Sequence, residues 1–82
     1  MKAKQEIIAQ VNSFFIHTLD MDAACVVPDA ELKRDMGITS VDAVAIASFV
    51  QKTFGCTIRR DDVRIIITMQ DLYDYIEKKQ TL

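Results

Sequence analysis

The chain has 82 residues, 50% of them apolar, which suits a single domain over residues 1–82 with one modest core. Ten basic and twelve acidic side chains give a formal net charge of -2, and no long cluster of Lys and Arg offers a surface for nucleic acid. Its apolar runs are too short for a membrane span, and Glu6 and Gln10 stand where a signal peptide would need its apolar segment, so we expect a soluble cytoplasmic protein. A monomer is expected as well, although the sequence does not fix the oligomeric state.

Helical periodicity marks the N-terminal part of the chain. Apolar residues recur at three- and four-residue spacing through residues 3–19 and share one face of a predicted first helix: Ile7, Ile8, Val11, Phe14, Phe15 and Leu19. Pro28 and Gly37 then mark a long loop, which could contain a short turn of helix at residues 30–34. Bulky apolar residues inside this loop indicate that it is held against the core.

Two further helices are predicted in the second half. Residues 40–54 contain neither Gly nor Pro and are rich in alanine, and Gly55 can end that helix in the left-handed conformation. Asp61 or Asp62 could cap one short turn after it. Thr68 then opens a last helix with one apolar face, made by Met69, Leu72, Tyr73 and Ile76. We interpret its two tyrosines, Tyr73 and Tyr75, as packing residues.

The apolar run at residues 63–67 could also form a strand, because Val and Ile fit a pleated surface. No second run of this type offers it a partner, and a lone strand leaves its backbone groups unpaired. The predicted fold class is therefore all-α: a small four-helix bundle with a long loop between the first and second helices and a short third helix.

The start of the second helix combines a cap with an exposed hydroxyl. Thr39 and Asp42 form T-x-x-D, a pattern typical of a capping box. Ser40 is then the first helical residue, at the end where unpaired N–H groups and the helix dipole favour a phosphate. Because such boxes are common, this pattern alone favours an ordinary helix start.

The second helix is also apolar on two faces. One stripe contains Ala43, Ile46, Ala47, Val50 and Phe54, and the other contains Val41, Val44, Ala45 and Phe49. A helix that is apolar almost all round is either buried on both sides or presents one side to another molecule. The loop at residues 22–28 could cover the second stripe, or that stripe could dock partners beside Ser40.

Catalytic and metal-binding patterns are missing from the sequence. Cys25 and Cys56 are isolated and His17 is the only imidazole, so neither a zinc site nor a disulfide scaffold is indicated. We also find no nucleophile–base spacing and no glycine-rich phosphate loop. We therefore expect no enzymatic activity, no catalytic residue and no metal.

Residues 32–76 resemble the acyl carrier protein family without a gap. The usual pattern is D-L-G-x-D-S-L-D, then an apolar helix, a phenylalanine and I-T-T-V-x-D-x-x-x-Y-I. Counted from Ser40, the matching positions are Asp35, Gly37, Asp42, Phe54, Ile58, Thr68, Asp71, Tyr75 and Ile76. The resemblance implies a carrier-type helical bundle in which Ser40 bears a covalent 4′-phosphopantetheine arm, transferred from coenzyme A by a phosphopantetheinyl transferase that uses magnesium.

The resemblance further implies a function in lipid metabolism. A carrier holds acyl intermediates as thioesters on the arm and delivers them to acyl-transferring, condensing or ligating enzymes of fatty-acid, polyketide or related specialised biosynthesis. By analogy, the expected acyl-pocket residues are Leu32, Ile46, Ala47, Val50, Ile58 and Ile66. The expected partner-binding residues are Thr39, Val41, Asp42, Val44, Ala45 and Phe49.

Several positions depart from the family pattern. Thr39 replaces the usual aspartate and Val41 the usual leucine, and Asp42 is the only acid between positions 37 and 58. Arg59, Arg60 and Arg64 add positive charge where the family is often acidic. These departures suggest a specialised carrier whose partners dock through apolar contacts.

Two other readings stay open. The first is an unmodified carrier-like adaptor that binds proteins through the second helix. The second, a small DNA-binding regulator, is disfavoured because the second helix has no Arg, Asn or Gln set at helical spacing for base edges.

Overall fold

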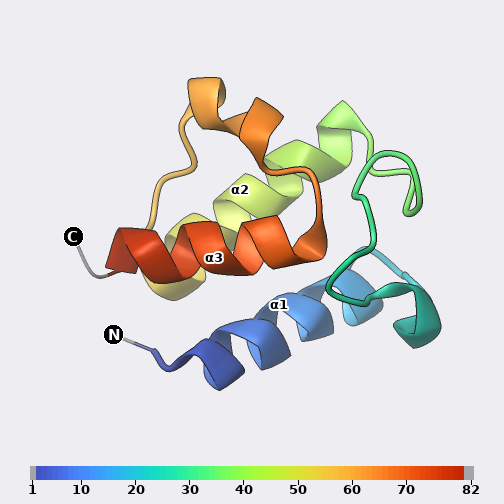
Figure 1. Cartoon of the computed structure of the whole chain (residues 1–82), viewed down its shortest axis with the longest axis horizontal. Helices are drawn as coiled ribbons and strands as arrows, with labels where there is room; N and C mark the ends of the chain where they lie inside the picture. The colour runs from blue at the N-terminus through green and yellow to red at the C-terminus, as the bar shows by residue number, and fades with distance from the viewer. Residues whose placement is uncertain (1, 81–82) are drawn as a thin grey trace.

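The computed structural model describes residues 2–80, and its helices follow the order expected from the sequence (Figure 1). The α-helices are α1 (Lys4–His17), α2 (Ser40–Phe54) and α3 (Met69–Gln80), and two 3₁₀-helices, η1 (Ala23–Cys25) and η2 (Arg60–Ile65), lie in the connections. Within residues 2–80 no strand forms, and the sheet-like pairing is limited to an isolated bridge between Glu31 and Thr68. The predicted all-α bundle is confirmed, with η2 as its short third helix.

Helices α1 and α3 lie side by side, and the two described ends of the chain meet. Lys4 of α1 pairs with Asp74 and Glu77 of α3, the latter at 3.2 Å. Lys2 donates its backbone N–H to Gln80 Oε1 at 3.2 Å, and Gln80 Nε2 donates to the Lys2 carbonyl at 3.0 Å. Figure 1 shows this closed end of the bundle, with the long loop at the opposite end.

The long loop is held against the core, although its short helix forms earlier than expected. Residues 32–36 form hydrogen-bonded turns in place of the helical turn suggested at residues 30–34. The helical segment is η1, where Asp22 accepts a hydrogen bond from the Ala24 N–H at 3.0 Å. The Leu32 N–H donates to the Ile67 carbonyl at 2.8 Å, and the Met69 N–H donates to the Ala30 carbonyl at 3.0 Å. Helix-type bonds also occur here, from the Asp35 N–H to the Glu31 carbonyl at 2.9 Å and from the Gly37 N–H to the Lys33 carbonyl at 3.2 Å, but they do not continue into a helix.

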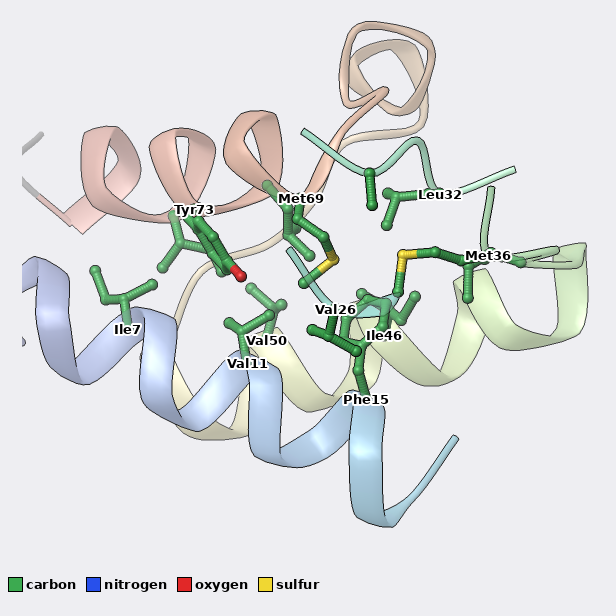
Figure 2. Close-up of a cluster of buried hydrophobic side chains, with 14 of the residues drawn as sticks. Ile7, Val11, Phe15, Val26, Leu32, Met36, Ile46, Val50, Met69 and Tyr73 are labelled. Atoms are coloured by element: carbon green, nitrogen blue, oxygen red, sulfur yellow. The ribbon is translucent and has the colours of Figure 1, made fainter. Parts of the chain in front are cut away.

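The core gathers side chains from all three α-helices and from the loop (Figure 2). Its fully or almost fully buried members are Ile7, Val11, Phe15, Val50, Met69, Leu72, Tyr73 and Ile76. Tyr73 lies in the middle of this set and donates its hydroxyl to Asn12 Oδ1 of α1. The tyrosine thus combines a large apolar contact area with a satisfied polar group.

The connection from α2 to α3 corrects one expectation about capping. Gly55 ends α2 with φ 71°, as predicted. The N-cap of η2 is Arg59, and no side chain caps it, so neither Asp61 nor Asp62 has the role expected from the sequence. The carboxylate of Asp62 accepts a hydrogen bond from Tyr75 of α3. Helix α3 itself begins after Thr68, as predicted, because Thr68 Oγ1 accepts from the Asp71 N–H at 3.1 Å.

Candidate functional site

A capping box fixes the start of α2. The Asp42 N–H donates to Thr39 Oγ1 at 3.2 Å, and the Thr39 N–H donates to Asp42 Oδ2 at 3.1 Å. Both halves of the predicted box are present, and Ser40 is the first helical residue, as expected. Ser40 is exposed to solvent, and its hydroxyl takes no part in either capping bond.

An apolar pocket of about 270 Å³ begins at this serine. Its lining comes from the long loop, α2, the segment around η2, and α3: Leu32, Lys33, Ile38, Thr39, Ser40, Ala43, Ile46, Ala47, Ile58, Val63, Ile66 and Leu72. Ser40 and Val63 line the pocket and also face solvent, so the pocket is open to the surface where they lie. A hydroxyl therefore stands at the rim of an otherwise largely apolar space.

The structure brings most of the expected pocket residues together. Leu32, Ile46, Ala47, Ile58 and Ile66 line this pocket. Val50 does not: its side chain is fully buried in the closed core between the helices (Figure 2). The position lies one helical turn beyond Ile46 on the same stripe, so periodicity alone could not separate a wall residue from a core residue.

Sequence reasoning missed several wall residues. They are Lys33, Ile38, Ala43, Val63 and Leu72. Ala43 stands three and four positions before Ile46 and Ala47, so helical spacing could have found it. Ile38 and Val63 belong to the connecting segments, where no periodic pattern indicates which way a side chain points.

The residues expected to bind partners lie in different environments. Val41 and Val44 are 77% and 71% exposed, so the loop at residues 22–28 does not cover them. Thr39 and Asp42 form the capping box, and Ala45 is half-buried. Phe49 packs against the core, and its ring stacks on the Phe14 ring of α1 with centroids 4.3 Å apart. Val41 and Val44 thus form the exposed apolar pair beside Ser40.

Charge on the side of η2 is mixed, because Asp61 and Asp62 lie in the first turn of η2 among three arginines. Helix α2 carries Asp42 near its start and Lys52 near its end. Arg59, Arg60 and Arg64 are exposed around η2, and Lys33 lies on the pocket wall next to the start of α2. Lys33 is therefore the positive charge on the pocket wall itself.

Neither a metal-binding cluster nor a membrane-spanning helix occurs among the described residues. Among residues 2–80 there is no group of three or more His, Cys, Asp and Glu side chains arranged to hold a metal ion. In the same part of the chain, no helix is both long enough and apolar enough to cross a membrane.

Comparison with known proteins agrees with this geometry. The family described as "Phosphopantetheine attachment site" matches residues 6–76, a span that runs from α1 through α3. The matched region includes the capping box, Ser40 and every residue that lines the pocket.

Curated proteins with the name acyl carrier protein align over most of the chain. The one from Thermotoga maritima is 33% identical over 79 residues, which is 96% of this chain and 98% of that protein. The one from Karelsulcia muelleri is 32% identical over 89% of this chain and 88% of its own length. The one from Solidesulfovibrio magneticus is 32% identical, with 90% and 95% covered. With an exposed serine at the start of α2 and an apolar pocket beside it, the chain belongs to the acyl carrier protein family, whose cofactor is 4′-phosphopantetheine.

Proposed function

We propose that Ser40 carries the 4′-phosphopantetheine arm of this acyl carrier protein and that the adjacent pocket receives the acyl chain. The observation that carries the proposal is the position of Ser40, which is exposed, first in α2 and part of the pocket lining. The chain has two other serines, Ser13 and Ser48, and neither lines this pocket.

The surroundings of Ser40 suit a phosphodiester. The N–H groups of Ser40 and Val41 precede the first intrahelical hydrogen bond of α2, which runs from the Ala43 N–H to the Thr39 carbonyl at 2.9 Å. These N–H groups and the positive end of the helix dipole stabilise an anion at this point. Lys33 adds a positive charge on the same pocket. The residues present therefore fit the cofactor.

The pocket suits an apolar cargo. When bound, the arm supplies a thiol that holds acyl groups as thioesters. Isoleucine, leucine and alanine side chains of the wall exclude water, and each methylene that enters such a space gains roughly 0.8 kcal/mol. The carrier itself then needs no catalytic group, because a phosphopantetheinyl transferase and acyl-processing enzymes make and break the bonds.

Val41 and Val44 provide the docking contact for these enzymes in this proposal. Their exposure next to Ser40 places apolar surface where every partner must approach the arm. Asp42 is the only acid of α2, and the arginines around η2 offset Asp61 and Asp62, so a basic partner finds little acidic surface here. We therefore place the carrier in a specialised pathway whose enzymes dock chiefly through apolar contacts. The cytoplasmic location and monomeric state expected from the sequence remain predictions.

Incubation with coenzyme A, magnesium and a broad-specificity phosphopantetheinyl transferase tests the attachment site. We expect the wild-type protein and Ser48→Ala to gain the mass of one arm, and Ser40→Ala to gain none. Ser48 is the matched control because it is also exposed and lies on the same helix. Absence of any gain in the wild type would favour the unmodified adaptor, in which α2 binds proteins without an arm.

The docking contact has its own test. Val44→Asp should slow the initial rate of arm transfer several-fold, whereas Val27→Asp, which alters an exposed valine of the long loop, should not. The rate for the wild type should fall only weakly with added salt. A steep loss of rate with salt, or equal effects of both variants, would contradict apolar docking at Val44.

A further inference from the structure

One wall of the pocket has no fully buried side chain, although Ile58 and Ile66 pack partly against the core. This wall is the segment of residues 58–66, which contains η2 and contributes Ile58, Val63 and Ile66 to the lining. No residue of η2 is buried, and Val63 and Ile65 are 46% and 62% exposed. In Figure 1 the segment lies at the edge of the bundle, on the side opposite α1. A segment with so few buried side chains opens locally at a low cost in free energy.

The hydroxyl of Tyr75 in α3 is bonded to this wall. Tyr75 donates its hydroxyl to Asp62 Oδ2 at 2.7 Å, and the Tyr75 hydroxyl oxygen accepts the Arg59 N–H at 3.3 Å. Arg59 is the N-cap of η2 and Asp62 lies in its first turn, so both bonds hold the same turn. Burial and the bond to Asp62 raise the pKa of Tyr75, so the hydroxyl stays the donor of this bond to a higher pH than an ordinary tyrosine would.

Other polar contacts involve the Tyr75 ring and the two ends of the wall. Lys79 Nζ lies over the Tyr75 ring, 5.4 Å from its centre. At the N-terminal end of the wall, the Thr57 hydroxyl bonds to Gln51 of α2. Thr57 directly precedes Ile58, the first residue of this segment that lines the pocket. At the far end, Asp71 accepts from the Ile67 and Thr68 N–H groups. Tyr75 acts between these two points.

We propose that Tyr75 is a positioning residue of the carrier: its hydroxyl clasps η2 to α3 and keeps the pocket wall closed over the acyl chain. This inference rests on the proposed function for the cargo, but the clasp itself belongs to the cargo-free protein. Hydrogen bonds to a carboxylate are stronger than those between neutral groups. Removing the hydroxyl therefore shifts the equilibrium between the closed and the open form of η2 markedly toward the open form. Loss of the clasp lets the wall open and exposes the cargo.

Hydrogen exchange of the unmodified protein tests the clasp directly. Two backbone N–H groups report on η2: that of Asp62, bonded to the Arg59 carbonyl at 2.9 Å, and that of Ile66, bonded to the Val63 carbonyl at 3.2 Å. In Tyr75→Phe and in Asp62→Ala, we expect both to exchange roughly tenfold faster, while amides in the middle of α2 keep their rates. The matched control is Asp61→Ala, which removes the same charge from the neighbouring, exposed position.

The outcome separates a clasp from a general effect of charge or stability. Unchanged exchange at Asp62 and Ile66 in Tyr75→Phe would overturn the proposal, and so would equal effects of Asp61→Ala and Asp62→Ala. Exchange that accelerates throughout α1, α2 and α3 would also overturn it, since Tyr75 would then stabilise the whole bundle and not the wall.

The effect on cargo is measured with a straight-chain octanoyl group attached through the arm. Cleavage of the thioester by hydroxylamine should be several-fold faster on Tyr75→Phe than on wild-type carrier, and unchanged on Asp61→Ala. Equal cleavage on the wild type and Tyr75→Phe would overturn the role of the clasp in shielding cargo. If Ser40 accepts no arm, the proposed function fails, while the exchange experiment still decides whether Tyr75 holds η2.

Discussion

Thr39 and Asp42 bond each other twice at the start of α2, with donor–acceptor distances of 3.1 and 3.2 Å. Thr68 and Asp71 repeat the arrangement at the start of α3, at 3.0 and 3.1 Å. In both places the side chains satisfy N–H groups that have no partner in the helix. At α2 the consequence is that Ser40 has a fixed position while its hydroxyl stays outside the cap.

Removing the α2 cap should weaken the fold modestly. Thr39→Ala should lower the free energy of unfolding by about 1 kcal/mol, because the Asp42 N–H loses its acceptor. Thr39→Ser keeps an oxygen at this place and should recover most of the loss. Urea denaturation followed by circular dichroism measures both values. Equal stability of Thr39→Ala and wild type, or equal losses in the two variants, would show that the box contributes little.

Filling the pocket should remove the stabilising effect of a bound acyl chain. Octanoyl-loaded wild type should melt several degrees above the carrier with a free arm, because ~1 kcal/mol corresponds to roughly 4–8 °C in a domain of this size. Ala47→Phe places a ring on the pocket wall and should abolish that difference. Ala9→Phe, at an exposed position of α1, should retain it. If Ala47→Phe retained the difference in melting temperature, the acyl chain would bind outside this pocket.

The two cysteines should differ sharply in reactivity. Cys25 is exposed in η1, whereas Cys56 is buried and directs its thiol to the Phe54 carbonyl at 3.6 Å. Burial also raises the pKa of Cys56, which reduces the thiolate fraction. Labelling with a maleimide, followed by intact mass, should therefore show one fast and one slow addition. Simultaneous labelling of both thiols in the folded protein would contradict the position of Cys56.

Alkaline pH should destabilise the protein partly through Tyr73. Burial raises the pKa of this tyrosine above its ordinary value of about 10, so the unfolded state loses the proton first. The stabilising contribution is complete below about pH 10 and declines as the pH rises from there through the pKa of the folded state. Tyr73→Phe should lose less stability than wild type between pH 9 and 11 in urea titrations. An identical decline in both proteins would exclude Tyr73 as a contributor.

The elements that local sequence determines were predictable. Periodic apolar residues marked α1 and α3, T-x-x-D marked the cap of α2, and Gly55 marked its end. These features depend on residues within one or two helical turns of each other. The same local patterns placed Ser40 at the first position of α2, which is the centre of the candidate site.

The remaining features depend on contacts between distant segments. The turns at residues 32–36 are held to a distant segment, because the Leu32 N–H donates to the Ile67 carbonyl. Phe49 turns toward Phe14 because α1 and α2 bring the two rings together. The bond from Tyr75 to Asp62 likewise joins two elements, and in the sequence Tyr75 suggested only packing. Such contacts require the three-dimensional arrangement of the bundle.

The most direct test of the central claim is the location of the arm in the modified wild-type protein. Trypsin releases residues 35–52 as one peptide that contains both Ser40 and Ser48, and fragmentation of that peptide by mass spectrometry distinguishes the two. We predict that the added phosphopantetheine is found on Ser40 alone. An arm on Ser48 or Ser13, or a protein that several transferases leave unmodified, would contradict the assignment of Ser40 as the attachment site.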